Sequence, residues 1–196
     1  LPDSSLNFKG GIIKLSFDEN ISPTGIVLST FPLMSTTPKI TVNKKTVSIN
    51  IPDSLLETNT TYQLKFGNSI KDIYEGTAYK DLSLTFSTGN NIDNLFLQGT
   101  VTQANTGMYD TGVHVLLYSK LLSDTDVTYR KPLYVTKVGE TGVFTFTNLP
   151  NKAFYIYAVK NTNNNYIYDA PNERIAFLTR PIDATNDSKQ IINLFT

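Results

Sequence analysis

The segment Leu82-Ser83-Leu84-Thr85-Phe86-Ser87-Thr88-Gly89 alternates between apolar and polar side chains and ends in a small, polar turn. Successive residues of an extended chain point to opposite sides, so Leu82, Leu84 and Phe86 share one face. A strand with this pattern covers a core with one face and meets water with the other. The segment therefore predicts one strand of a half-buried sheet.

The same two-residue period recurs through the first half of the chain. Proline, glycine and asparagine interrupt it at short intervals, and only residues 52–56 suggest a single helical turn. Short strands at this spacing, with no long amphipathic helix, predict a β-sandwich. The predicted strands are residues 11–18, 25–29, 39–42, 46–51, 61–66 and 82–87.

A polar, turn-forming stretch at residues 87–94 separates this half from a second series of strands. We therefore predict two domains, residues 1–89 and 95–196, joined by a linker at 90–94, and a protruding loop at 119–132. The fold class we predict is all-β, with two tandem β-sandwich domains. The strands predicted in the second half are residues 95–101, 113–118, 134–138, 143–147, 153–159, 175–179 and 190–195.

The composition excludes several classes of function. The 17 basic and 17 acidic residues among 196 cancel, so no net charge attracts nucleic acid or an anionic membrane. The absence of cysteine removes disulfides, thiolate metal sites and cysteine nucleophiles. No apolar run approaches the ~20 residues of a transmembrane segment. Because the chain begins at Leu1, we expect a trimmed or mature fragment of a longer protein.

Residues 13–21, 56–64 and 84–89, with a turn that contains Asp72, form a recognisable series. Tyr62 opens a strand just after a polar turn, as the tyrosine of a tyrosine corner does. On these residues the first half resembles the bacterial Ig-like domains of S-layer and other envelope proteins. The resemblance implies an Ig-like sandwich over residues 1–89. Residues 75–77 depart from the family, which usually has Gly-Asn after the aspartate, and this leaves the local turn open.

Residues 99–101, 112–118 and 142–150, followed by 154–158 and an asparagine-rich loop, carry a second resemblance. They are similar to the transthyretin-like, or carboxypeptidase-regulatory-like, modules of Bacteroidetes surface proteins. The resemblance implies a small Greek-key sandwich over residues 95–196 that serves as a spacer, a stabiliser or a binding platform. It does not by itself give a function.

Together the two resemblances imply an exported protein of the cell envelope or cell surface, anchored as an outer-membrane lipoprotein. We expect a non-catalytic structural or adhesive module whose partners are other envelope proteins or glycans. The alternative is a carbohydrate-binding surface protein associated with glycan uptake. An enzyme fragment is a third hypothesis, and it requires a deep pocket lined by acids or by His114.

The asparagine-rich loop, residues 161–173, carries side-chain oxygens at alternate positions. Short loops that wrap calcium space their oxygen donors in this way, so we predict a weak calcium site with the Ile167 carbonyl contributing. Tyr166 stands where an EF-hand requires glycine, so the loop is not an EF-hand. A polar turn, with asparagines bonded to their own backbone, is the other interpretation. The predicted ligands are Asn161, Asn163, Asn165, Asp169 and Glu173; relatives often carry aspartate at the position of Asn161.

Four tyrosines cluster near this loop, and outward aromatic rings of this kind can stack on sugars or form an interface. They are equally typical of cross-strand pairs that stabilise a sheet. The predicted ligand-binding residues are Tyr155, Tyr157, Tyr166 and Tyr168.

The remaining candidates favour structural roles. His114 alternates with valines inside a strand, so we expect it to point to solvent or to the weaker face of its sheet, without a catalytic partner. Three acid pairs lie in apparent turns, where carboxylates cap backbone amides rather than face each other across a cleft. These pairs are Asp18 with Glu19, Asp72 with Glu75, and Asp124 with Asp126.

Overall fold

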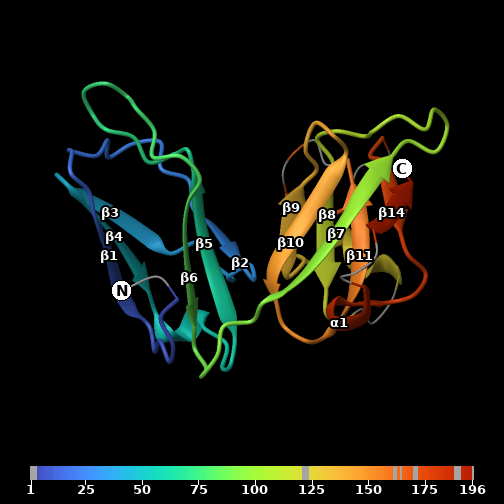
Figure 1. The fold of residues 1–196 in the computed structure, drawn as a ribbon, viewed down its shortest axis with the longest axis horizontal. Helices are drawn as coiled ribbons and strands as arrows, with labels where there is room; N and C mark the ends of the chain where they lie inside the picture. The colour runs from blue at the N-terminus through green and yellow to red at the C-terminus, as the bar shows by residue number, and fades with distance from the viewer. Residues whose placement is uncertain are drawn as a thin grey trace. The chain divides into compact units, whose positions relative to one another are not determined.

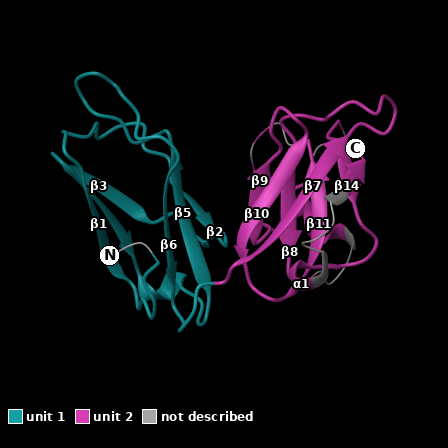
Figure 2. Ribbon diagram, in the orientation of Figure 1, with its two compact units in different colours: residues 1–92 teal, residues 93–196 magenta. Residues whose placement is uncertain are grey.

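The structure is a computed structural model that describes residues 4–120, 124–160, 163, 165–169, 172–187 and 191–195. The chain divides into two compact units, Leu1–Ile92 and Asp93–Thr196, and each is described by itself (Figure 2). Strands dominate both units, and the only α-helix in the described ranges is the four-residue α1 (Ala184–Asp187). The predicted fold class, all-β with two tandem β-sandwiches, is confirmed.

Unit 1 consists of two antiparallel three-stranded sheets (Figure 1). The first sheet has the order β1-β4-β3, from β1 (Gly11–Ser16), β4 (Thr46–Ile51) and β3 (Lys39–Asn43). The second has the order β2-β5-β6, from β2 (Ser29–Phe31), β5 (Thr61–Gly67) and β6 (Leu82–Ser87). The predicted helical turn is the 3-10 helix η1 (Asp53–Leu55).

The alternating pattern places one face of each sheet in the core of unit 1. Ile13 of β1 lies opposite Ile49 of β4, and both are fully buried. Phe86 of β6 stacks on Tyr62 at 5.4 Å and contacts the edge of Phe8 at 4.8 Å. The buried cluster consists of Ile13, Ile21, Val47, Ile49, Ile51, Tyr62, Leu64, Phe66, Ile70, Leu84 and Phe86.

Tyr62 makes the predicted tyrosine corner. Its hydroxyl accepts a hydrogen bond of 2.8 Å from the backbone N–H of Glu57, five residues upstream. This bond fixes the segment that precedes β5 to the start of β5, as the corner tyrosine does in Ig sandwiches. Burial raises the pKa of the Tyr62 phenol, so the hydroxyl stays protonated at neutral pH.

The strand predicted at residues 25–29 is wrong, because the chain is still turning there. Gly25 has a φ of 78°, and the backbone N–H of Val27 donates to Ser69 Oγ instead of to a neighbouring strand. Regular pairing begins only at Ser29, where β2 joins β5. A short apolar run, Ile26-Val27-Leu28, in a loop thus resembled a strand.

Unit 2 also has two sheets, and in Figure 1 β10 and β7 lie in front of β8, β9 and β11. The front sheet has the order β10-β7-β14, from β10 (Val143–Leu149), β7 (Leu95–Thr102) and β14 (Ile191–Phe195), with β14 parallel to β7. The rear sheet has the order β12-β11-β8-β9, and β13 (Ile182–Asp183) also pairs with β11. Its strands are β12 (Ile175–Phe177), β11 (Ala153–Val159), β8 (His114–Tyr118) and β9 (Tyr134–Lys137).

The rear sheet is covered on both faces. All five residues of β8 are buried, although alternate ones point away from the front sheet. Part of the cover comes from the connection between β8 and β9, which contains the 3-10 helix η2 (Asp124–Thr128). Asp126 and Val127 are 0% and 4% exposed. The prediction that this connection protrudes is therefore wrong for its described part.

Hydrogen bonds hold this connection against the sheet. Tyr118 of β8 donates through its hydroxyl to the Arg130 carbonyl at 3.2 Å. The Asp126 carboxylate accepts from the Tyr129 hydroxyl at 2.5 Å and pairs with Arg130 at 3.4 Å. The buried Asp126 carboxylate bonds to neighbours within the same segment, so its charge is satisfied without solvent. The charged residues of this connection therefore did not indicate a protruding loop.

Candidate cation-binding loop

The asparagine-rich loop connects β11 to β12 in the rear sheet of unit 2. Val159 pairs with Ile175, and beyond that pair the Lys160 N–H donates to the Arg174 carbonyl at 2.9 Å. The loop therefore begins and ends at two residues that face each other across a closed hairpin. Of the five predicted ligands, Asn161 lies outside the described residues, and the other four are described.

Two of the asparagines shape the backbone. Asn163 Oδ1 accepts from the Asn165 N–H at 3.1 Å, and Asn165 Oδ1 accepts from the Ile167 N–H at 3.0 Å. These are the local side-chain bonds that the polar-turn interpretation predicts. Each amide oxygen has a second lone pair, so the same oxygen can accept an N–H and bind a cation. The two interpretations therefore share one geometry.

Hydrogen bonds link both carboxylates to neighbouring residues of the loop. Asp169 Oδ2 accepts from Asn165 Nδ2 at 2.6 Å, and Asp169 Oδ1 lies 3.4 Å from Asn163 Nδ2. Glu173 is 5% exposed, and its Oε2 accepts from the Asp169 N–H at 3.2 Å. The structure thus brings together the four described residues of the predicted set: Asn163, Asn165, Asp169 and Glu173.

The donor set decides which cation would fit. In the described part of the chain, no three His, Cys, Asp or Glu side chains lie close enough to hold a metal ion. An ion here would depend on two carboxylates with amide and carbonyl oxygens. Hard oxygen ligands of this kind suit calcium, and two charges give modest affinity. They do not suit zinc, which takes nitrogen and sulfur ligands.

Tyr166 holds a left-handed conformation, at the position where an EF-hand loop has glycine. Its φ is 63°, which costs a bulky residue about 1 kcal/mol. Its ring contacts the edge of His114 at 5.3 Å, and the Tyr168 N–H donates to the Val127 carbonyl at 2.9 Å. Packing on the rear sheet thus supports the turn. Because strands rather than helices flank the loop, it remains distinct from an EF-hand.

The four tyrosines proposed for ligand binding do not form an open platform. Tyr157 is 7% exposed, and its ring packs between Tyr118 at 5.8 Å and Phe177 at 5.7 Å. No free face of Tyr157 remains for a sugar ring. The other three, Tyr155, Tyr166 and Tyr168, are half-buried.

His114 lies on the outer face of the rear sheet, opposite Val159, but it does not reach solvent. It is 8% exposed because Tyr166 covers it, so of the two expected positions, solvent or the weaker face of the sheet, the first is wrong. Burial lowers the pKa of the imidazole, and the charge of Lys137 lowers it further. The ring is therefore neutral at physiological pH and acts as a packing surface beneath Tyr166.

Of the acid pairs, Asp72 caps backbone amides as predicted, whereas Asp18 and Asp126 bond to side chains. The Asp72 carboxylate is 3% exposed and accepts from the N–H groups of Tyr74, Glu75 and Thr77 at 2.7 to 2.8 Å. Asp18 accepts a 2.6 Å hydrogen bond from the Tyr79 hydroxyl, which lowers the pKa of Asp18. The partners Glu19 and Glu75 are exposed, and the side chain of Asp124 lies outside the described part.

The hydrogen bonds to Asp72 predict an acid-sensitive turn. The N–H groups, that of Glu75 first, lower the pKa of Asp72, although burial opposes them. A carboxylate whose pKa is lower in the folded state stabilises the fold above its unfolded value of about 3.9 and ceases to do so as the pH falls. We expect Asp72→Asn to lower the urea midpoint of unit 1 at neutral pH, with a difference from the wild type that narrows between about pH 5 and pH 2. A constant difference would contradict this role.

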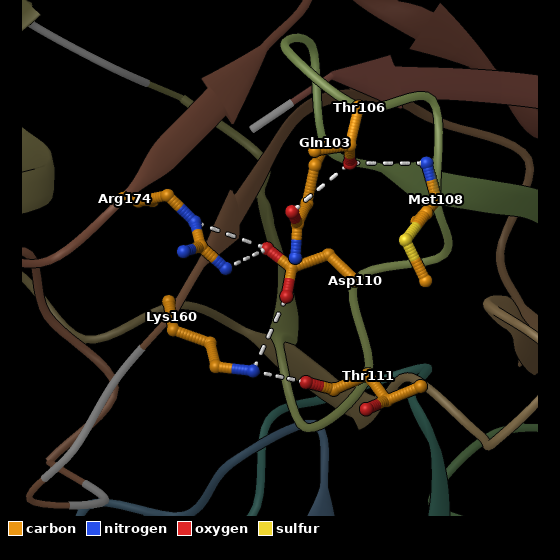
Figure 3. Close-up of polar contacts among 7 residues, drawn as sticks. All are labelled: Gln103, Thr106, Met108, Asp110, Thr111, Lys160 and Arg174. Carbon is orange, nitrogen blue, oxygen red and sulfur yellow. Dashed lines mark hydrogen bonds and ion pairs between the residues drawn. The ribbon is translucent and has the colours of Figure 1, made fainter.

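Sequence reasoning missed Asp110, which Figure 3 shows between two basic side chains. Its carboxylate is 1% exposed and accepts from Arg174 Nη2 at 2.6 Å, Arg174 Nε at 3.2 Å and Lys160 Nζ at 3.2 Å. Lys160 Nζ also donates to the Thr111 carbonyl. Nothing around Asp110 in the sequence marks it, because its partners lie 50 and 64 residues further along the chain.

Comparisons with solved structures found the major pilin subunit BcpA of Bacillus cereus and a variant of it. Both are 12% identical to this chain and cover 97% of it, with TM-scores of 0.30 and 0.31. The chain spans 59% of the length of either pilin structure. At this sequence identity and TM-score, the similarity does not indicate a shared fold or a shared function.

No curated protein matches the chain. No helix in the described ranges is long and apolar enough to cross a membrane. Over residues 2–88 the chain matches the family model of the bacterial Ig-like domain, and unit 1 is therefore Ig-like.

Proposed function

We propose that this chain is a non-catalytic structural or adhesive module of an exported bacterial envelope protein, displayed at the cell surface by a lipid-anchored parent. One observation carries the non-catalytic part of the proposal: the buried acids Asp72, Asp110 and Asp126 are used to hold loops. Asp72 caps a turn, Asp110 pairs with two cations, and Asp126 folds the β8–β9 connection. Carboxylates committed in this way are poor candidates for acid–base catalysis, which needs a group free to exchange protons with a substrate.

The second unit contributes a loop that we propose binds calcium weakly. Asn163, Asn165, Asp169 and Glu173 already converge, and the Ile167 carbonyl lies in the same turn. A bound calcium ion would replace the amide N–H groups that now satisfy Asp169. It would stabilise a surface loop without adding a chemical step.

Calcium melts test the loop directly. Differential scanning calorimetry of the full chain, in millimolar calcium and in chelator, should show one transition shifted upward by calcium, since a ligand that binds only the folded state stabilises it. Magnesium at the same concentration should shift it less, because magnesium demands a stricter octahedral geometry. Identical curves in calcium and chelator would remove the calcium proposal and leave the structural one standing.

The domain assignment is tested by separating the units. Residues 1–92 and 93–196, expressed alone, should each unfold cooperatively, because each has its own core. If either fragment lacks a cooperative unfolding transition, the two halves do not act as independent spacers.

Surface display is tested on whole cells. Antibodies against the chain should label intact cells of the source bacterium; labelling only after lysis would contradict surface display.

The glycan alternative has less structural support, since Tyr157 is enclosed by two rings. We expect soluble oligosaccharides to leave the tyrosine resonances of unit 2 unchanged. Saturable shifts at Tyr155, Tyr166 or Tyr168 would favour carbohydrate binding instead.

A further inference from the structure

Asp110 stands apart from the other buried acids because it joins two loops. It belongs to the connection between β7 and β8, and its two partners flank the asparagine-rich loop. Lys160 is the first residue after β11, and Arg174 is the last residue before β12. The two residues at the ends of the loop therefore share one carboxylate (Figure 3).

The connection that carries Asp110 is itself fastened. The Asp110 N–H donates to the Val101 carbonyl at 3.0 Å, and the Gln103 N–H donates to the Met108 carbonyl at 2.8 Å. The hydroxyl of Thr106 bonds Gln103 Oε1 at 3.1 Å. A carboxylate mounted on a hydrogen-bonded turn offers a fixed point, whereas one on a free loop would move with its partners.

The geometry at Arg174 fixes direction as well as distance. Its Nε and Nη2 both reach Asp110 Oδ2, so the planar guanidinium is held in one orientation. The next residue toward the loop is Glu173, which is buried and accepts from the Asp169 N–H. A shift of Arg174 would therefore move Glu173, and through the hydrogen bond also Asp169, so both carboxylates of the proposed cation site would be displaced.

We propose that Asp110 is a positioning residue for this site: it is a clamp that holds Lys160 and Arg174, which flank the asparagine-rich loop, and so orders the described ligands Asn163, Asn165, Asp169 and Glu173 before any cation binds. Asp110 does not touch the cation. It lowers the entropic cost of binding, because the backbone that carries the four described ligands is ordered before the cation binds. The inference rests on the proposed calcium function for its ligand, but the ordering of the loop is a property of the calcium-free protein.

Two measurements on Asp110→Asn test the clamp. The first is hydrogen exchange in chelator, at the amides of Asn165, Ile167 and Asp169, which are bonded inside the loop. We expect exchange at these three amides to rise about tenfold or more, with exchange in β7 and β10 unchanged. The second is calcium affinity by isothermal titration, which should fall about tenfold while the variant remains folded.

Glu140→Gln is the matched control, since it removes one exposed carboxylate from the β9–β10 turn of the same unit. It should leave both measurements unchanged. Arg174→Lys serves if Asp110→Asn does not fold: the charge remains, the paired hydrogen bonds are lost, and the effects should be smaller with the same sign.

The outcomes separate the two proposals. Unchanged exchange at the loop amides in Asp110→Asn would overturn the clamp, whatever the wild type does with calcium. If the wild type binds no calcium but the loop amides lose protection in the variant, the clamp stands and the calcium function fails. Lost protection with unchanged calcium affinity would show that the clamp orders the loop without serving the site, and would overturn the positioning role.

Discussion

Ile13→Ala is expected to destabilise unit 1 by about 2–5 kcal/mol, whereas Ile12→Ala should stay within about 0.5 kcal/mol of the wild type. The two residues are neighbours on β1 with the same side chain. Ile13 is fully buried against Ile49 of the paired strand, and Ile12 is 62% exposed. Truncation of the first leaves a cavity in a close-packed core, while truncation of the second removes atoms that already meet water.

Urea denaturation followed by tyrosine fluorescence gives both values, and the transition of unit 2 is an internal reference. It should not move in either variant, because the lost contacts belong to the core of unit 1. A loss of several kcal/mol is a large fraction of the stability of a small domain. Equal losses from the two substitutions would contradict the two-faced sheet on which the Ig-like assignment depends.

The alternation that makes this prediction possible is also what made the fold predictable. In β4 the apolar residues Val47, Ile49 and Ile51 fall on one side, and all three are fully buried. Their period of two is a direct consequence of the pleated backbone. Apart from residues 25–29, the predicted strands were found in both units, and so was the tyrosine corner at Tyr62, because each depends on residues close together along the chain.

Features that depend on distant residues were not predictable. The parallel pairing of β14 with β7 joins residues at opposite ends of unit 2, and β13 has only two residues, too few to show a period. The cover over the outer face of the rear sheet was missed for the same reason. A buried Asp126 and a buried His114 look like solvent-facing residues until the segments that cover them are known.

The candidate site shows the same division. Its ligand loop was predicted from side chains at alternate positions in one short segment, and the described members do converge. The clamp at Asp110 could not be predicted, because it joins that loop to a turn 50 residues earlier. Local chemistry is therefore visible in the sequence, while the supports that position it become visible only in the fold.

Asn163→Asp should reverse its effect on stability when calcium is added. In chelator the substitution removes the amide that faces Asp169 Oδ1 at 3.4 Å and places a second negative charge there, so the Tm should fall by a few degrees. In calcium the new carboxylate becomes a third charged ligand, and affinity in such loops rises with ligand charge. We expect binding roughly tenfold tighter than in the wild type and a higher Tm at millimolar calcium.

Asn163 suits this test because its side chain is exposed, so the substitution leaves the core intact. Asn172→Asp is the matched control: it adds the same charge to the same loop, also at an exposed position, but outside the predicted ligand set. If calcium is only attracted to negative charge, the two variants should gain affinity equally. If calcium is coordinated at the predicted site, only Asn163→Asp should gain affinity. Its Tm should then be lower than that of the wild type in chelator and higher in calcium, a reversal that general destabilisation cannot produce. A variant that is weaker than the wild type in both conditions would show that Asn163 only shapes a polar turn.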